Sequence, residues 1–186
     1  MMNKGILLPI AAPSGTGKTT VCRQLIEKLD NCSFSISCTT RKPRPNETEG
    51  KDYYFLEQET FEKYIQENKF IEWERHFDNY YGTLKSTLEE AIANNQILLL
   101  DIDVNGAMNI KKQFPEDTIA IFLKPPSIEE LLRRLSARGT EDEKSLVIRK
   151  ARIPEEMKLS KYFDYEIIND NLKIAVNQII DIIKEK

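Results

Sequence analysis

Short runs of consecutive apolar residues recur along the chain at residues 6–11, 97–100, 118–123 and 165–168. A polar residue directly follows each of the last three runs, and the glycine-rich stretch 12–17 follows the first. Such runs are typical of strands buried on both faces of a parallel sheet. Helical spacing lies between them, and this alternation predicts an α/β fold in which helices cover both faces of the sheet.

Three helices can be placed from their start signals. Residues 86–89 (Ser-Thr-Leu-Glu) and 127–130 (Ser-Ile-Glu-Glu) have the form of capping boxes, which predicts helices over about 86–94 and from 127 onward. A last helix spans about 172–183. Pro9 interrupts the first apolar run. Either that strand ends near Pro9 or the ladder lacks a partner at the missing N–H.

Two segments depart from the alternating pattern. Over residues 34–83, apolar and polar residues alternate with a period near two, and aromatic residues cluster. This pattern is typical of a small antiparallel sheet with one solvent-exposed face. Residues 126–155 are helical in pattern, poor in core apolar residues and rich in arginine, which suits a mobile flap. The predicted division is a core of 1–33, 92–125 and 156–186, an insert of 34–91 and a lid of 126–155.

Composition narrows the class of protein. A chain of 186 residues fits one compact domain with inserts, and a net charge of −3 argues against a general nucleic-acid binder. No apolar run is long enough to cross a membrane. The three cysteines have no metal-like spacing and their number is odd, so we expect reduced thiols and a cytoplasmic location.

Residues 12–19 (Ala-Pro-Ser-Gly-Thr-Gly-Lys-Thr) join the first predicted strand to a helix and have the chemistry of a phosphate cradle. Gly15 and Gly17 allow backbone N–H groups to turn toward an anion at the helix N-terminus. Lys18 can reach the β- and γ-phosphates, and the Thr19 hydroxyl can bind magnesium. The Walker A pattern has glycine where this chain has Ala12. An ordinary glycine-rich turn is the alternative, but the flanking strand and helix favour the cradle.

A stiff basic loop follows in the insert. Arg41 and Arg44 lie close together around a proline, and two guanidinium groups can fork onto one phosphate, with Tyr53 and Tyr81 as further donors. A solvated basic loop without a ligand explains the same spacing equally well.

Glu72 lies in an aromatic-rich strand, and its carboxylate suggests which nucleotide base the protein recognises. Guanine presents its N1–H and N2 amino group side by side, and one carboxylate accepts both, whereas adenine has a lone pair at N1. Hydroxyls of Ser37 and Thr83 can serve the remaining guanine edge, and such a site can reject the wrong base by ~10⁴–10⁵-fold. A surface glutamate is the alternative.

Together these segments resemble guanylate kinase across nearly the full length, in family order and spacing. The resemblance is carried by APSGTGKTT at 12–20, SCTTRKPRP at 37–45, GKDYYF at 50–55, FIEWE at 70–74, NYYGT at 79–83, LLLDID at 98–103, ARGTE at 137–141 and IIND at 167–170. It implies a P-loop, doubly wound parallel sheet core with a small antiparallel GMP-binding insert and a helical lid.

The resemblance also implies roles for individual residues. It implies that GMP is bound by Ser37, Arg41, Arg44, Tyr53, Glu72, Tyr81 and Thr83. To this set we add Asp101 and Asp103. On ATP the expected residues are Ala12, Pro13, Ser14, Gly15, Thr16, Gly17, Lys18, Thr19 and Thr20, with Arg134 and Asn169, the latter near adenine. The expected catalytic residues are Lys18, Arg44, Arg138 and Arg149.

The implied reaction is ATP + GMP giving ADP + GDP. The acceptor phosphate is ionised near pH 7, so no general base is required, and catalysis rests on positioning and charge neutralisation. We expect Mg²⁺ with ATP, bound directly by Thr19 and through water by Asp101. Arg138 and Arg149 would act like arginine fingers, whereas Arg134 has an alternative role in an i,i+4 pair with Glu130.

Two other functions stay open at this point: a kinase for another nucleoside monophosphate, and a non-catalytic guanylate-kinase-like module that binds proteins. The intact cradle disfavours the second. For the enzyme we expect ATP and GMP as partners, neither nucleic acid nor membrane, and a monomer or weak homodimer.

Overall fold

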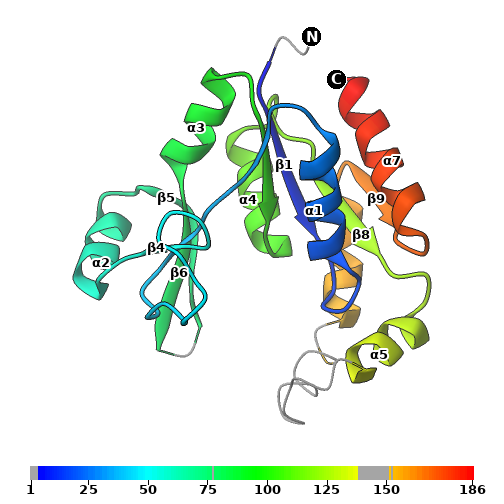
Figure 1. The fold of residues 1–186 in the computed structure, drawn as a ribbon, viewed down its shortest axis with the longest axis horizontal. Coiled ribbons are helices and arrows are strands. Elements are labelled where there is room, and N and C mark those ends of the chain that lie inside the picture. The colour runs from blue at the N-terminus through cyan, green and yellow to red at the C-terminus, as the bar shows by residue number, and fades with distance from the viewer. Residues whose placement is uncertain (1–3, 77, 138–150, 152) are drawn as a thin grey trace.

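A five-stranded parallel sheet forms the centre of the molecule, in the order β2-β7-β1-β8-β9 (Figure 1). The computed structural model describes residues 4–76, 78–137, 151 and 153–186. The strands of this sheet are β1 (Ile6–Ala11), β2 (Cys32–Phe34), β7 (Ile97–Asp101), β8 (Ile121–Lys124) and β9 (Tyr165–Ile168). The predicted parallel α/β core is therefore confirmed, and β2 adds an edge strand that was not predicted, of which only Phe34 belongs to the alternating segment.

Helices bury both faces of this sheet because its strands are apolar on both sides. Ile6, Leu8 and Ile10 of β1 pack with α1 (Lys18–Lys28) and α7 (Leu172–Lys184). The alternate residues Leu7 and Ala11 pack with α3 (Lys85–Ala93) and α4 (Val104–Gln113) on the opposite face. The continuous apolar runs thus reflect burial from two sides.

Pro9 lies inside β1 opposite Leu100 of β7. The Leu7 N–H donates to the Asp117 carbonyl, and the Leu7 carbonyl accepts from the Ile119 N–H, both in the segment that leads into β8. Because Pro9 lies two residues further along the strand, the position of its missing N–H faces β8 as well. The β1–β8 register resumes only at Ile10. The strand therefore continues through Pro9, and the proline occupies a break in pairing with β8.

A second, four-stranded sheet stands beside the core, in the order β4-β3-β6-β5 (Figure 1). It comprises β3 (Cys38–Thr39), β4 (Tyr54–Phe55), β5 (Phe70–His76) and β6 (Asn79–Leu84). The expectation of an antiparallel sheet is wrong for one pair, since β3 and β4 are parallel. The long connection between them returns the chain to the end at which β3 begins, so β4 runs in the same direction as β3. The other pairs are antiparallel, and the sheet is therefore mixed.

Two helices were missed in the sequence. The first, α2 (Gln58–Gln66), covers the small sheet and stacks Phe61 on Phe70 with ring centroids 4.3 Å apart. The second, α4, is capped at its N-terminus by Asp103, whose Oδ1 accepts a hydrogen bond of 2.7 Å from the Gly106 N–H.

The two predicted capping boxes had different outcomes. The Glu130 N–H donates to Ser127 Oγ at 3.1 Å, which confirms Ser127 as the N-cap of α5 (Ile128–Ala137). The cap predicted at Ser86 is wrong, because α3 begins at Lys85 after Leu84, and no side-chain cap bond forms there. The chain enters α3 directly from β6, so Ser86 already lies in the first turn.

Beyond α5, residues 153–159 are helical and lead through a 3-10 turn, η1 (Ser160–Tyr162), into β9. Residues 138–150 and 152 of the predicted lid lie outside the described residues. Within the described part of the chain, no helix is both long and apolar enough to span a membrane.

Candidate active site

The loop between β1 and α1 has the backbone shape of a phosphate cradle. Gly15 and Gly17 have φ of +92° and +94°, a left-handed conformation that favours glycine. A Cβ at Gly17 would lie 2.9 Å from Asn169 Nδ2, and one at Gly15 would lie 2.9 Å from Leu135 Cγ. Ala12 is not among the described residues with positive φ. Its departure from the Walker A pattern therefore leaves the turn unstrained.

Buried hydrogen bonds hold the loop in place. Thr16 Oγ1 donates to the Pro13 carbonyl at 2.7 Å, and Asn169 Nδ2 donates to the Thr16 carbonyl at 2.8 Å. The Gly17 carbonyl accepts the first helical bonds from Thr20 and Val21, so the N–H groups before them have no acceptor within the helix. Gly17 has no capping side chain, which leaves these donors facing the loop.

Lys18 and Asp101 meet at the edge of the sheet, as the sequence predicts for the loop and the end of β7. Lys18 Nζ lies 2.6 Å from Asp101 Oδ1 and donates to the Ile102 carbonyl at 2.9 Å. Thr19 and Thr20 follow in the first turn of α1, and both are exposed. A cation, a carboxylate and two hydroxyls thus lie within one short stretch of the sheet edge.

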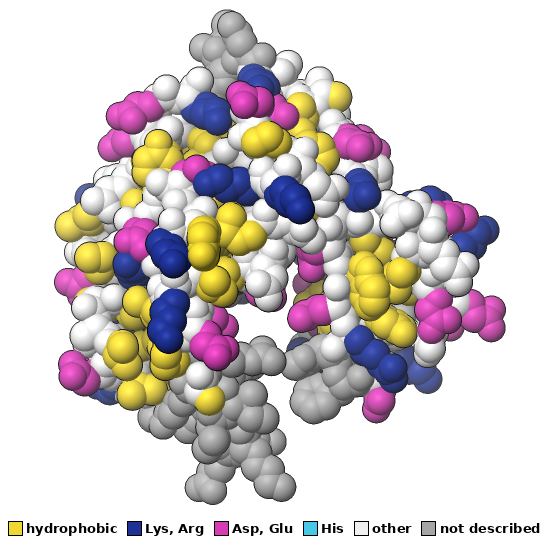
Figure 2. Space-filling model, turned by 180° about the vertical axis from the view of Figure 1, so that it is seen from behind, with side chains coloured by type: hydrophobic (Ala, Val, Ile, Leu, Met, Phe, Trp, Pro, Cys, Tyr) yellow, Lys and Arg dark blue, Asp and Glu magenta, His cyan; other side chains and the backbone are white. Residues whose placement is uncertain are grey.

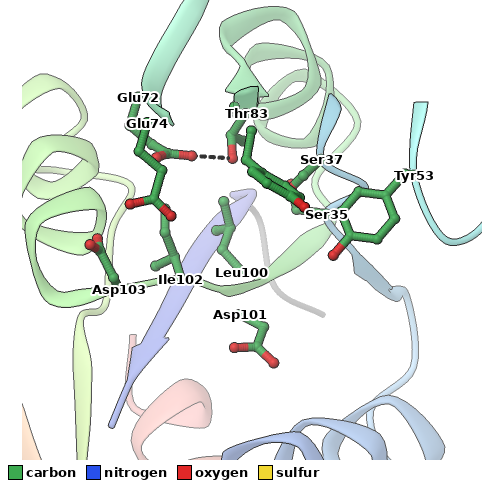
Figure 3. A pocket seen from close by; sticks show the side chains of 12 residues that line it. Ser35, Ser37, Tyr53, Glu72, Glu74, Thr83, Leu100, Asp101, Ile102 and Asp103 are labelled. Carbon is green, nitrogen blue, oxygen red and sulfur yellow. Dashed lines mark hydrogen bonds between the residues drawn. The ribbon is translucent and has the colours of Figure 1, made fainter. Parts of the chain in front are cut away.

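A cavity of about 170 Å³ opens between the two sheets and shares Asp101 with the loop (Figure 3). Seen from behind, the molecule is hollowed between the small-sheet side and the core, with acidic side chains at the rim (Figure 2). The cavity brings together seven predicted residues, Ser37, Tyr53, Glu72, Tyr81, Thr83, Asp101 and Asp103. Sequence reasoning missed five other lining residues, Ser35, Glu74, Gly82, Leu100 and Ile102.

Glu72 is held in this cavity by the pairing of β5 with β6. It lies opposite Thr83, whose Oγ1 donates to Glu72 Oε1 at 2.7 Å (Figure 3). Burial raises the pKa of the Glu72 carboxyl, and the nearby carboxylates of Asp103 and Glu74 raise it further, against the Thr83 hydrogen bond. The carboxylate has one hydroxyl donor in place and faces an open cavity.

The predicted phosphate-binding loop gathers around Arg41. Its guanidinium lies 5.4 Å from the Tyr53 ring centroid, and the Tyr53 and Tyr81 rings are 6.1 Å apart. Arg41 Nη2 also bonds Glu47 Oε1 at 2.8 Å, a partner that the sequence did not reveal. This bond holds the pKa of the Glu47 carboxyl below its ordinary value. Arg44 donates its backbone N–H to Glu47 and is exposed.

Arg134 and Asn169 lie together behind the loop. Arg134 Nε bonds Glu130 Oε1 at 2.8 Å, the i,i+4 pair raised as an alternative, and Arg134 Nη1 contacts the Asn169 carbonyl at 3.4 Å. Asn169 is buried beneath the loop through its bond to Thr16. Arg138 and Arg149, the predicted lid arginines, lie outside the described residues.

The phosphate cradle at the N-terminus of α1 and the cavity share the Asp101 carboxylate, at the C-terminal edge of the parallel sheet. This arrangement defines a P-loop nucleotide-binding protein of the nucleotide kinase class. The model of the guanylate kinase family matches residues 4–186. The chain belongs to the guanylate kinase family.

Named relatives agree with this assignment over most of their length. A guanylate kinase of Chlorobium chlorochromatii is 47% identical, with 94% of this chain and 92% of that protein covered. One of Thermotoga maritima is 40% identical, with 98% and 88% covered. The crystal structure of guanylate kinase from Anaplasma phagocytophilum superposes with a TM-score of 0.76 at 31% identity, over 98% of this chain and 86% of that one.

Proposed function

We propose that this protein transfers the γ-phosphoryl group of ATP to GMP, and also to dGMP, giving ADP and the guanosine diphosphate. The observation that carries the proposal is the position of Asp101, which pairs with Lys18 of the loop and also lines the cavity containing Glu72. A donor and an acceptor bound at these two places would meet at one edge of the sheet, as direct transfer requires.

Guanine binds in the cavity. The Glu72 carboxylate accepts from N1–H and the N2 amino group, while Thr83 keeps it oriented and Ser37 bonds the opposite edge of the base. Asp103 adds a second acceptor on the same wall as Glu72 (Figure 3). An adenine in this place would leave Glu72 buried without a donor on the ring, which a site of this kind penalises strongly.

The acceptor phosphate binds to Arg41, Arg44, Tyr53 and Tyr81. Arg41 is already desolvated on one side by the Tyr53 ring, and its partner Glu47 keeps it paired in the free protein. Because a phosphate carries more charge than a carboxylate, the guanidinium exchanges its single bond to Glu47 for a bidentate bond to the phosphate when GMP arrives.

The triphosphate of ATP binds to residues 12–20. The loop N–H groups and Lys18 hold its β- and γ-phosphates, and Arg134 with Asn169 lies on the side where adenine leaves the loop. Lys18 is paired with Asp101 in the free protein. Its ammonium therefore starts within the site and needs only a short rotation to reach the phosphates.

We propose that Mg²⁺ accompanies ATP. The Thr19 hydroxyl and the Asp101 carboxylate supply hard oxygen donors of the kind that this ion prefers, and Mg²⁺ takes its other ligands from phosphates and water. Thr19 would bind it directly and Asp101 through water. When bound, the ion neutralises phosphate charge and holds the donor in one geometry.

Catalysis follows from positioning and positive charge. The GMP phosphate oxygen attacks the γ-phosphorus of ATP, the bond to the bridging oxygen of ADP breaks, and no proton has to be removed from the nucleophile. Lys18 and Arg44, with Arg138 and Arg149 of the lid, neutralise the charge that spreads over the transferred group. The lid would also exclude water as a competing acceptor.

We propose the functional division of core (1–33, 92–125, 156–186), GMP-binding insert (34–91) and lid (126–155), although α3 of the insert packs on the central sheet. We also propose cytoplasmic purine nucleotide metabolism, for a monomer or weak homodimer that binds neither nucleic acid nor membrane. Cys22, Cys32 and Cys38 are all free, and Cys22 and Cys38 are buried, which fits a reducing compartment.

A coupled assay of ADP release tests the substrate assignment. ATP is offered with GMP, dGMP, AMP, UMP or dTMP, and release is expected with the guanine nucleotides alone. Equal or faster turnover with another monophosphate would indicate a different nucleotide kinase. No transfer to any of them by a folded, ATP-binding protein would indicate a non-catalytic module. Lys18→Ala is the matched negative control.

A further inference from the structure

The Ser35 hydroxyl is a buried group whose partner is missing from the folded chain. Ser35 is 6% exposed, and its Oγ has no hydrogen-bond partner among the described residues. The backbone around it is fixed, since the Ser35 N–H donates to the Leu99 carbonyl of β7 at 2.8 Å. A buried hydroxyl that stays unpaired is costly, so such a group points to a partner that arrives with a ligand.

The same residue lines the acceptor cavity, so its hydroxyl lies directly behind the cavity wall. Figure 3 places Glu72, Glu74 and Asp103 along one wall, and Ser35 and Ser37 across the cavity from them. Ser35 and Ser37 are two residues apart in the link between β2 and β3, and both line this cavity. The cavity therefore has a wall of hydrogen-bond acceptors opposite a wall of hydroxyl donors.

Guanine has the complementary asymmetry. Its N1–H and N2 amino group are donors on one edge, and O6 and N7 are acceptors on the edge away from N2. With the donor edge on Glu72, the acceptor edge faces the hydroxyl wall. We propose that Ser35 Oγ donates a hydrogen bond to the O6/N7 edge of the acceptor base. Ser35 is thus a further recognition residue of the site, an inference that rests on the proposed function.

The test variant is Ser35→Ala, with GMP and 7-deaza-GMP as acceptors. The KM for GMP is expected to rise roughly three- to tenfold, the loss typical of one neutral hydrogen bond, while kcat and the KM for ATP stay within about twofold. If Ser35 bonds N7, 7-deaza-GMP will show no further loss in the variant. If it bonds O6, both acceptors will lose equally. Either pattern supports the inference.

Stability separates recognition from a structural role. Because the free protein has no bond to lose, Ser35→Ala should keep or raise the thermal midpoint and should reduce the upward shift that GMP causes. Ser160→Ala is the opposite control. Ser160 is also buried, but its one hydroxyl proton is shared between the Met157 carbonyl and Glu166 Oε1, so its loss should lower the midpoint and leave the KM for GMP unchanged.

The outcomes also separate this inference from the proposed function. A wild-type protein that neither binds nor phosphorylates GMP would refute the function itself. A wild type that uses GMP, together with a Ser35→Ala variant of unchanged KM, would overturn the role of Ser35 alone. Ser35→Cys provides a second variant, whose weaker donor should give an intermediate KM if the hydroxyl donates to the base.

Discussion

At the scale of single residues, Glu72 carries the largest conflict between folding and function. Its carboxylate is half-buried beside two other carboxylates, which raises its pKa. An ionised group in this place is costly to the free protein and useful only when a base brings donors to it. A loss of folding stability of this kind is expected at sites that bind polar ligands.

Glu72→Gln tests this trade-off. The amide presents one acceptor where two are needed, so kcat/KM for GMP should fall by a factor of about 100 or more, while the KM for ATP changes little. The variant should also have a higher thermal midpoint at pH 7, because no charge is buried. Glu59→Gln, an exposed change on α2, should alter neither quantity. Unchanged GMP kinetics in Glu72→Gln would contradict the base assignment.

The raised pKa of Glu72 predicts the direction of a pH effect. Protonated Glu72 cannot accept both guanine donors, so the KM for GMP should rise as the pH falls through this pKa. For the free protein the sign is opposite: the raised folded pKa contributes stability at low pH that is lost as the pH rises through it.

The neighbouring residues provide the control for this effect. Glu74→Gln removes a charge that raises the pKa of Glu72, so the rise in KM should begin at lower pH. Thr83→Val removes the hydrogen bond that lowers it, so the rise should begin at higher pH. The KM for GMP is measured against pH for the wild type, Glu74→Gln and Thr83→Val, which gives both shifts in the pKa of Glu72. Coincident profiles would refute the stated causes.

Some of the residues that line the cavity were predicted from the sequence, and others were missed for a physical reason. Glu72 was singled out because one carboxylate can accept from both the N1–H and the N2 amino group of guanine. Glu74 shares a face with Glu72 through the two-residue period of a strand, and Ser35 lies two residues before Ser37 in the link after β2. That period cannot tell which face meets the cavity. Glu47 pairs with Arg41 across a turn of the loop, which no local pattern specifies.

At the scale of elements, the phosphate loop depends on two glycines of different surroundings. Gly15 lies against Leu135 of α5, and Gly17 lies against Asn169 after β9. The loop is therefore confined by two elements distant in the sequence, while its own φ angles admit only glycine easily. Ala12 lies outside this constraint.

Gly17→Ala should damage the cradle. The left-handed backbone costs a non-glycine residue about 1–2 kcal/mol, and the added methyl would displace Asn169. We expect lower stability by that amount and at least a tenfold higher KM for ATP. Ala12→Gly is the control, with activity close to wild type in the same assay. A large gain from Ala12→Gly would instead show strain at that position.

Elements were predictable where one signal dominated. Continuous apolar runs identified four core strands, because burial on both faces leaves no polar alternation. Helix α2 was missed because Phe61, Tyr64 and Ile65 were grouped with the alternating segment around them. The parallel pairing of β3 with β4 depends on a long connection whose path no local pattern determines.

At the scale of the whole molecule, parallel strands bring distant segments to one edge. The bond from Asn169 to Thr16 joins residues 153 positions apart, and Lys18 meets Asp101 across β1 and β7. Figure 1 shows the small sheet on one side of this edge and α5 on the other. The arrangement places the acceptor cavity on one side of the loop and α5, with Arg133 and Arg134, on the other.

Asn169→Ala should loosen this assembly. It removes a buried hydrogen bond between two buried residues and leaves the Thr16 carbonyl unpaired. We expect a loss of about 1–3 kcal/mol in the free energy of unfolding and a higher KM for ATP. Urea denaturation and steady-state kinetics measure the two effects. Asn94→Ala, an exposed change at the end of α3, should change neither. A stability equal to wild type in Asn169→Ala would contradict the role of this bond.

The central claim is that the cradle and the cavity serve one transfer between two nucleotides. Phosphorus-31 NMR of wild-type protein with ATP, GMP and magnesium observes that transfer directly. We predict that the β-phosphate signal of GDP grows at the rate at which the γ-phosphate of ATP disappears, with little free phosphate, and that Glu72→Gln slows this growth by about 100-fold or more when GMP is below its KM. Inorganic phosphate appearing in place of GDP, or no change with folded protein, would contradict the account.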